Sequence, residues 1–399
     1  MRITNKIMQN NSLNNVNYNK VLMDKYNSQM SSQKKINRPS DDPVVAIRAL
    51  RLRSNVAEVT QYYSKNIPDA ESWLSVTEGA LDNVVTVITD MYKQCTKGSS
   101  GELTSEDREI ILESLKALRD EVYATGDADY AGRYVFTGYR TDTSLMFPET
   151  TSQTYEITEQ LDKASADTMT FVNTTIQATD ANGDDVTLDL YDTNTSNYED
   201  IGITEQNIEA MQVHRIRLAY SGLLDVAPEL KHMTLDAAGN KVESYYVDKD
   251  GKEIKAEHVK VTNSYELPNP YTESANNPDS VIFVKDTGEL LLGENIYNQV
   301  LATKDNPKTS GVDEGEIRVT YQKKEWDKGD LRPEHYFACT TDPGTDDAIK
   351  YNHDYLESME GSTQIIEYDV GFNQSLRVNS TADECFKHGV GREVDDLIK

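Results

Sequence analysis

The apolar residues between positions 43 and 96 follow a pattern that predicts one long helix. They recur at alternating steps of three and four residues, as in a helix of a bundle or a coiled coil. At 1.5 Å per residue, such a helix would span roughly 80 Å, so we expect a rod at this end of the chain. The positions expected to pack in its seam are Leu52, Val56, Val59, Tyr63, Leu74, Leu81, Val84, Ile88 and Met91.

Two prolines mark where this helix begins and where it is disturbed. The polar side chains at 40–42 can cap its first amides, and Pro43 is tolerated in a first turn. Pro68 lies inside the pattern and removes one backbone hydrogen bond near Ser64. We therefore expect a single helix with a bend at that point.

A second helix is predicted after the turn at 97–101. Thr104 and Asp107 have the spacing of a capping box, and an apolar stripe continues from there to Gly126. Because the connection is short, the two helices should be antiparallel. An aromatic, strand-like segment follows at 130–139.

The first 36 residues show a weaker pattern. Eight Asn residues occur among the first 27, and Asn lowers helix propensity. We therefore expect residues 1–42 to be poorly ordered unless a partner helix covers them.

From about residue 140, short β-like runs are joined by acidic turns that contain Gly. The clearest hairpin arms are 281–284 and 289–292. Helical spacing interrupts these runs at 204–224, and residues 392–399 have the pattern of the first turns of a helix. Further strands are expected at 317–322, 336–339, 365–370 and 375–378.

Together these patterns predict an α+β fold. Its base should be a long antiparallel α-helical rod or bundle, with β-rich outer domains inserted into it. The expected parts are an N-terminal export and assembly segment at 1–42, a helical rod domain at 43–144 completed by 203–225 and 316–399, and an outer insertion at 145–202 and 226–315.

Charge is unevenly divided along the 399 residues. Residues 1–140 hold 18 basic and 18 acidic side chains, whereas the remainder holds 22 and 50 and so carries the whole net charge of −28. An acidic chain repels phosphate, which excludes a generic nucleic-acid binder. No segment approaches the ~18 apolar residues of a membrane span, so we expect no membrane partner. The neutral N-terminal part is suited to packing against copies of itself, although acidic loops that only aid solubility would explain the charge equally well.

Motifs that carry chemistry are missing from the sequence. It contains no HExxH, GxSxG, P-loop or GxGxxG pattern, and Cys95, Cys339 and Cys385 are too scattered for a disulfide framework or a CxxC metal site. His335 lies four positions before Cys339, but the aromatic residues between them favour a strand, where this spacing separates two ligands. We therefore expect no enzyme, no metal and no cofactor.

A basic cluster at Arg48, Arg51 and Arg53 is the one local positive feature. It fits a solvated helix face. It also fits a contact between subunits, in which these arginines meet acidic residues on a neighbouring copy.

Several motifs, in the same order along the chain, resemble the flagellin superfamily. Residues 30–43 (MSSQKKINRPSDDP) and 46–53 (AIRALRLR) are similar to its N-terminal signature, and the form NRPSDDP is more similar to superfamily members at the junction of hook and filament than to filament flagellins. Further matches occur at 66–74, 132–138, 215–222, 371–374 and 391–396. We expect the subunit interface at Asn37, Arg38, Pro39, Asp41, Asp42, Arg48, Arg51 and Arg53.

Two features depart from the superfamily pattern. Its members usually have Gly where this chain has Gln33. They also end in a long helix that pairs with the N-terminal one, whereas this sequence stops at Lys399, so we expect a C-terminally truncated form.

The resemblance implies a structural adaptor of the bacterial flagellum, extracellular after export through the flagellar type III apparatus. The implied partners are hook-associated protein 1, flagellin, further copies of the chain in a ring, and an export chaperone. Two alternatives stay open. One is a filament flagellin with a variable surface insertion, and the other is an enzyme or adhesin within that insertion.

Overall fold

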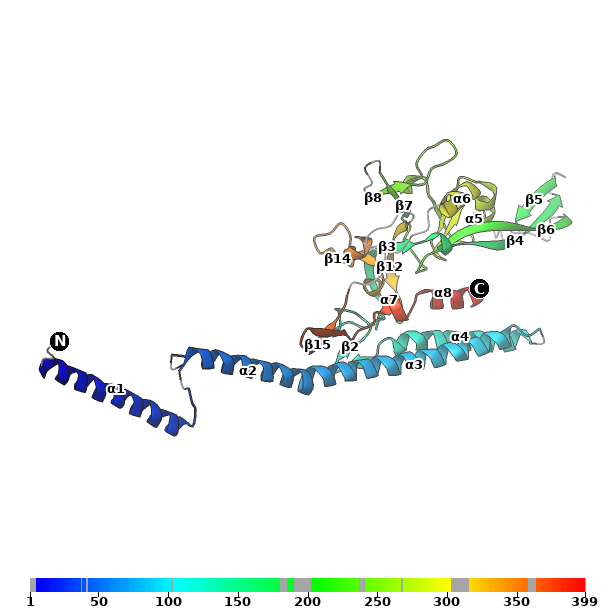
Figure 1. Ribbon diagram of the computed structural model, residues 1–399. Helices are drawn as coiled ribbons and strands as arrows, with labels where there is room; N and C mark the ends of the chain where they lie inside the picture. The colour runs from blue at the N-terminus through cyan, green and yellow to red at the C-terminus, as the bar shows by residue number, and fades with distance from the viewer. Residues whose placement is uncertain are drawn as a thin grey trace. The chain divides into compact units, whose positions relative to one another are not determined.

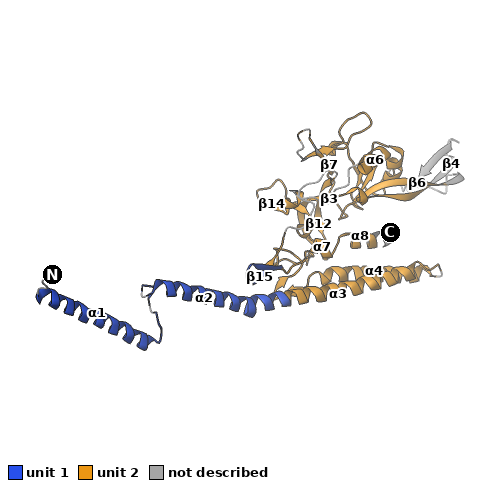
Figure 2. Cartoon of the chain, in the orientation of Figure 1, with its two compact units in different colours: residues 1–71, 368–376 blue, residues 72–367, 377–399 orange. Residues whose placement is uncertain are grey.

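The structure is a computed structural model, and it confirms the predicted α+β class (Figure 1). The chain divides into two compact units (Figure 2). Unit 1 comprises residues 1–71 and 368–376, and unit 2 comprises residues 72–367 and 377–399. The residues that the structure describes are 5–36, 38–40, 42–101, 103–179, 185–189, 202–236, 238, 241–266, 268–302, 316–357 and 364–398.

Unit 1 begins with two helices, α1 (Asn5–Ser32) and α2 (Pro43–Gln61). The 28 residues of α1 contain neither Gly nor Pro and form one uninterrupted helix. None of these residues is buried. The expectation that this segment is poorly ordered unless a partner helix covers it stays a prediction. Gln33 then takes a φ of 53°, the left-handed conformation that usually ends a helix at Gly.

The predicted start of α2 is correct. Asp42 caps it by accepting a hydrogen bond from the Val45 amide at 3.2 Å, and Pro43 occupies the first turn. The predicted disturbance before Pro68 is also present, as a single π-helical turn at Tyr62–Asn66, in which the Ile67 amide donates to the Tyr62 carbonyl. The proline has no N–H to offer Ser64, so the backbone shifts its hydrogen-bond partners instead of breaking.

A hairpin of β15 (Glu367–Gly371) and β16 (Gln374–Arg377) covers one side of this π-helical turn. The rings of Tyr62 and Phe372 meet edge to face with centroids 6.0 Å apart. Asn66 Nδ2 donates to the Asp369 carbonyl at 2.7 Å. The hairpin therefore packs against and hydrogen-bonds to the segment where the backbone departs from α-helical geometry.

Helix α3 (Ile67–Gly98) leads into unit 2, where α4 (Ser105–Thr125) runs back along it in the predicted antiparallel arrangement (Figure 1). The expected capping box is formed: Thr104 Oγ1 accepts from the Asp107 amide at 3.2 Å, and the carboxylate of Asp107 accepts from the Thr104 amide. The ring of Trp73 is 1% exposed and packs against Tyr130 of the short hairpin β1 (Asp129–Tyr130) and β2 (Arg133–Tyr134).

Two six-stranded sheets make up most of unit 2. The first has the order β5-β4-β6-β11-β10-β9 and the second the order β14-β13-β3-β12-β7-β8. The strands of the first sheet are β4 (Ala166–Thr179), β5 (Asp185–Asp189), β6 (Gly202–Arg217), β9 (Lys260–Thr262), β10 (Val281–Val284) and β11 (Glu289–Leu292). Those of the second are β3 (Thr151–Leu161), β7 (Glu229–Leu235), β8 (Lys241–Tyr245), β12 (Ile317–Trp326), β13 (Ala338–Thr341) and β14 (Ile349–Tyr351).

Residues of both sheets share one large hydrophobic cluster, to which Ile216 and Phe283 contribute from the first sheet and Ile157 and Val319 from the second. Trp326 lies within it, with the rings of Phe147, Tyr155 and Tyr220 each 5.0–5.1 Å away between centroids. The helices beside the sheets are α5 (Pro270–Asn276), α6 (Glu294–Ala302), α7 (Ala382–Cys385) and α8 (Gly389–Ile398). The 3₁₀ turns are η2 (Lys163–Ser165), η3 (Ala256–His258), η4 (Pro333–His335) and η5 (His353–Glu357).

The prediction of a helix at 204–224 is wrong, because these residues begin in β6. This strand pairs with β4 from Ala166 opposite Ile216 to Thr179 opposite Gly202. Val213 and Ile216 lie on opposite faces of the strand and are each buried in a different cluster. A strand that is buried on both faces does not alternate between apolar and polar residues, which is the pattern that identifies a strand in a sequence. The apolar residues of β6 therefore had the spacing of a helix.

Most other predicted elements are confirmed. The hairpin 281–284 with 289–292 is β10–β11, the strand expected at 317–322 is part of β12, and the helix expected at 392–399 is part of α8. The strand expected at 336–339 begins two residues later, as β13, because Pro333–His335 form a 3₁₀ turn. The other two late strands form the hairpin β15–β16.

Candidate assembly surface

The predicted seam of α2 is not packed within the described part of the chain. Leu52, Val56, Val59 and Tyr63 are 65%, 64%, 49% and 79% exposed. These residues follow one another at three- and four-residue steps, so they form one continuous apolar stripe on the helix. Soluble monomers rarely leave such a stripe in water, which makes it a candidate contact surface.

On α3 the packed face is displaced by one residue from the predicted seam. The predicted positions Leu74 and Ile88 are 40% and 45% exposed, Leu81 and Met91 are half-buried, and only Val84 is buried. The residues that are buried instead are Trp73, Thr77, Ala80 and Val87. Both faces have the same three- and four-residue spacing, so the sequence pattern alone did not tell them apart.

The residues of the predicted subunit interface have different environments. Asn37 and Asp41 lie outside the described residues. Asp42 caps α2, whereas Arg38 and Pro39 are exposed.

The three arginines of the basic cluster do not share one face of α2. Arg48 and Arg51 are one helical turn apart, whereas Arg53 points roughly 140° away from Arg48 around the helix axis. All three are exposed, and none forms an ion pair with another residue that the structure describes. The structure therefore reduces the cluster to a pair, Arg48 and Arg51.

The sign of the net charge differs between residues 1–71 and the rest of the chain. Residues 1–71 hold 11 basic and 6 acidic side chains, a net charge of +5, which leaves −33 for residues 72–399. The neutrality of the first 140 residues thus hides a basic N-terminal segment followed by an acidic pair of helices. Opposite charges on one chain favour contacts between copies.

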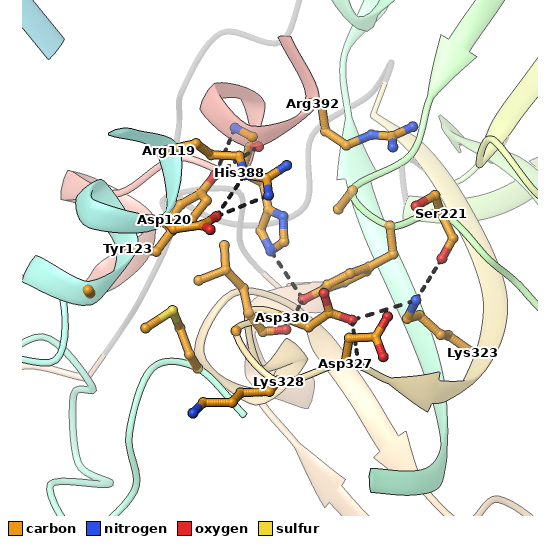
Figure 3. A pocket seen from close by; sticks show the side chains of 17 residues that line it. Arg119, Asp120, Tyr123, Ser221, Lys323, Asp327, Lys328, Asp330, His388 and Arg392 are labelled. Carbon is orange, nitrogen blue, oxygen red and sulfur yellow. Dashed lines mark hydrogen bonds and ion pairs between the residues drawn. The ribbon is translucent and has the colours of Figure 1, made fainter. Parts of the chain in front are cut away.

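The helices of unit 2 are joined to its sheets through α8. The Gly391 amide donates to Tyr123 Oη of α4 at 2.8 Å, and His388 Nε2 lies 3.1 Å from Tyr220 Oη (Figure 3). The ring of Phe136 stacks edge to face on Phe386 with centroids 4.8 Å apart. α8 and the residues just before it therefore form the joint between the helical base and the β part of unit 2.

A cleft of about 550 Å³ lies beside this joint, between α4, α8 and the turn 327–331 (Figure 3). Lys323, one of the cations that line it, is held locally: its Nζ donates to the Ser221 carbonyl at 2.7 Å and lies 3.8 Å from Asp330. Burial lowers the pKa of Lys323, and burial together with Arg392 lowers the pKa of His388 to about 3. His388 is therefore neutral near pH 7 and acts as a packed hydrogen-bonding ring.

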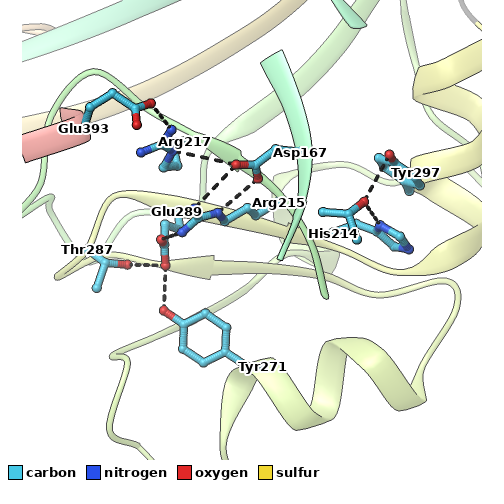
Figure 4. A network of polar contacts seen from close by, with 10 residues as sticks. Asp167, His214, Arg215, Arg217, Tyr271, Thr287, Glu289, Tyr297 and Glu393 are labelled. Atoms are coloured by element: carbon cyan, nitrogen blue, oxygen red, sulfur yellow. Dashed lines mark hydrogen bonds and ion pairs between the residues drawn. The ribbon is translucent and has the colours of Figure 1, made fainter. Parts of the chain in front are cut away.

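A second set of charged contacts fastens α8 to the first sheet (Figure 4). Arg217 Nη2 donates to Glu393 of α8 at 2.5 Å. The neighbouring Arg215 bridges Asp167 on β4 and Glu289 on β11, at 3.0 and 2.6 Å. These pairs connect strands and helix from distant parts of the sequence, so their role is to hold the joint in place.

Sequence reasoning missed this joint. Residues 391–396 were matched to the superfamily, but nothing in their pattern pointed to Tyr123 or Arg217 as partners. The described residues contain no group of three or more His, Cys, Asp or Glu side chains placed to hold a metal ion. His335 Nε2 instead lies 3.1 Å from the Ser144 carbonyl. Among the described helices none is long and apolar enough to cross a bilayer.

The N-terminal part of the chain is similar to proteins of bacterial flagella. Residues 3–141 match the family model described as the bacterial flagellin N-terminal helical region. Over 145 residues the chain is 30% identical to flagellar hook-associated protein 3 of Escherichia coli K12, covering 36% of this chain and 45% of that protein. Over 169 residues it is 29% identical to the protein of the same name from Salmonella typhimurium LT2, covering 41% and 53%. The chain thus spans about half the length of these curated relatives.

Solved structures with similar regions have flagellar names as well. A flagellar hook-associated protein from Vibrio parahaemolyticus is 33% identical over 28% of this chain and 49% of its own, with a TM-score of 0.25. FlgL from Xanthomonas campestris is 13% identical over 69% and 74%, also with a TM-score of 0.25. These scores are too low to establish a common overall fold. In its N-terminal helical region the chain is thus similar to bacterial flagellins and to hook-associated protein 3 of two bacteria.

Proposed function

We propose that this protein is a non-enzymatic structural subunit of the bacterial flagellum, which joins the hook to the flagellin filament. Its partners on the two sides would be hook-associated protein 1 and flagellin, with further copies of the chain completing a ring. The proposal is supported by the similarity to hook-associated protein 3 in two bacteria. The observation that carries it is the long run of exposed apolar residues on the N-terminal helices.

These helices have the properties of parts that are completed by assembly. α1 buries none of its residues, and the stripe on α2 from Leu52 to Tyr63 has no cover within the described chain. We assign the predicted seam to contacts with other helices, in the same molecule and in its neighbours. Before assembly an export chaperone would bind the same surface, because an exposed apolar helix otherwise aggregates.

The β part would then lie on the outside of the assembly. Residues 141–399 carry a net charge of −28, which keeps neighbouring copies of an outer surface apart. An N-terminal segment at 1–42, a rod at 43–144 and an insertion at 145–202 and 226–315 belong to this proposal. The ranges expected to complete the rod, 203–225 and 316–399, contain β6 and β12, which pair with β4 and β3 of the insertion, so these two strands are assigned to the β part. Export through the flagellar type III apparatus and an extracellular location also belong to the proposal.

Deletion of the gene tests the proposed role. We expect cells that build hooks, lack filaments and release flagellin into the medium, with all three defects reversed by the gene on a plasmid. A filament flagellin, the alternative function, would give hooks without filaments and no flagellin in the medium. Normal filaments in the deletion strain would contradict both functions.

A further inference from the structure

Besides the apolar stripe, a second face of α2 is left uncovered by the residues that the structure describes. It is turned roughly 100° from that stripe around the helix axis and combines apolar and positive side chains. Val44 and Ile47 on this face are 59% and 54% exposed. We call it the basic face, and its members, at the helical spacing i, i+3, i+4 and i+7, are Val44, Ile47, Arg48 and Arg51.

Helix α4 carries a face with the same spacing and the opposite charge. It lies opposite Leu115 and Val122, two of the three residues that α4 buries. Ile110 at its centre is 69% exposed. We call it the acidic face, and its members are Glu106, Glu109, Ile110 and Glu113.

We propose that the basic face of one copy binds the acidic face of a second copy. Two observations favour a second copy over another partner. First, Arg48, Arg51, Glu106 and Glu109 form no ion pair with any other residue in the described part of the chain, and Glu113 pairs only with Lys116, on the surface at 2.5 Å. Second, each face has an exposed apolar residue beside its charges, so contact would bury apolar area and pair the charges together.

The contact is heterologous, because it joins two different surfaces. Each copy keeps one basic and one acidic face free, so copies can add in sequence and form a ring or a helical array. The acidic face points away from Leu115 and Val122, and the centre of the basic face is turned from the apolar stripe, so this contact can form beside the seam. The inference rests on the proposed function and names the lateral contact between neighbouring subunits.

Charge reversal with complementation tests the contact. The association constant of the purified protein is measured by sedimentation at low ionic strength for the wild type, for Arg48→Glu/Arg51→Glu and for Glu106→Lys/Glu109→Lys. We expect each double variant alone to associate at least about tenfold more weakly, because its two faces repel. A mixture of the two variants should regain association, because reversed faces attract each other across the pair.

Matched controls come from the same helices. Arg53→Glu, on the other side of α2, and Glu78→Lys, an exposed acid on α3, should leave the association constant within about twofold. Salt should weaken the wild type and the mixture alike. A wild type that stays monomeric at the highest soluble concentration, a mixture that does not recover, or an Arg53→Glu variant as weak as the double variants would overturn the inference.

The two proposals fail separately. A deletion strain with normal filaments would contradict the junction role, but it would not affect the contact measured with the purified protein. Failure of the mixing experiment would remove the contact, while hooks without filaments and released flagellin would still support the junction role.

Discussion

Gly391 donates its backbone N–H to Tyr123 Oη over 2.8 Å, across a separation of 268 positions in the sequence. A Cβ atom on Gly391 would lie 2.9 Å from the same oxygen, closer than a Cβ atom approaches another heavy atom without a bond. Glycine at this position thus allows α8 to lie against α4. This one contact links the helical base to the end of the β-rich part of unit 2.

Replacing Gly391 by Ala should therefore weaken the joint. We expect the free energy of unfolding to fall by about 1–3 kcal/mol, because Tyr123 must shift or α8 must move away. Urea denaturation followed by circular dichroism measures this. Gly389→Ala is the matched control, since a Cβ there would meet nothing within 4 Å. Equal losses in both variants would show that close approach to Tyr123 is unimportant.

The displaced packing face of α3 can be tested with two adjacent residues. Trp73 is 1% exposed and contacts Tyr130, whereas Leu74 is 40% exposed. Trp73→Ala should lower the free energy of unfolding of the monomer by about 3–5 kcal/mol. Leu74→Ala should lower it by less than about 1 kcal/mol. The reverse order would restore the originally predicted seam.

Ala substitutions at two glycines with positive φ distinguish the cost of backbone strain from the cost of a steric clash. A Cβ on Gly288, in the β10–β11 turn, would lie 1.9 Å from the Tyr220 carbonyl oxygen, whereas one on Gly251 would meet nothing within 4 Å. Gly251→Ala should cost about 1 kcal/mol, the price of a left-handed conformation. Gly288→Ala should cost at least about 3 kcal/mol more or prevent folding, measured by soluble yield and thermal unfolding. Similar melting temperatures would contradict this difference.

Glu159 makes stability depend on pH. It lies buried between the two sheets, accepts a hydrogen bond from the Ala219 amide at 2.7 Å and another from Tyr321, and burial raises its pKa to about 7 from an ordinary 4.5. Between these two values the folded chain holds a proton that the unfolded chain has lost. The free energy of unfolding is therefore highest, as far as Glu159 is concerned, below pH 4.5. It falls by about 3 kcal/mol as the pH rises to 7, because the folded chain then has to lose the proton or keep it at a cost.

Glu159→Gln should remove this part of the pH dependence. The amide can keep accepting both hydrogen bonds without carrying a charge, so the variant should be more stable than the wild type at pH 8 and differ less at pH 4.5. Urea denaturation across this pH range measures the difference. Glu156→Gln, on the same strand and half-buried beside Gln322, is the control. A wild-type slope that survives in Glu159→Gln would assign it to other groups.

Local signals predicted the elements that depend on local chemistry. The cap at Asp42, the capping box at Thr104 and the hairpin at Gly288 each rest on interactions within a few residues, and all three are present. Tertiary pairing overruled the pattern in β6, where burial on both faces produced a helical spacing. In α1 the local signals conflict, because its many Asn residues lower helix propensity whereas its freedom from Gly and Pro allows an uninterrupted helix.

The candidate surface was predictable in part for the same reason. Periodicity identified α2 as a helix with an apolar stripe, and the residue types identified its arginines. Which arginines share a face follows from helix geometry. Whether any described residue covers Leu52, however, depends on how all the other described elements pack, and no local pattern contains that information. The α4–α8 joint depends on Tyr123 and Gly391, which are far apart in the sequence and carry no shared motif.

The grip on α8 from two sides has a mechanical consequence. Tyr123 holds the backbone of α8 on one side, while Arg217 holds Glu393 from the sheet. A pulling force that separates the base from the sheet through α8 would pass through these two contacts in turn, because α8 lies between them. The weaker contact would then set the force at which this connection through α8 opens.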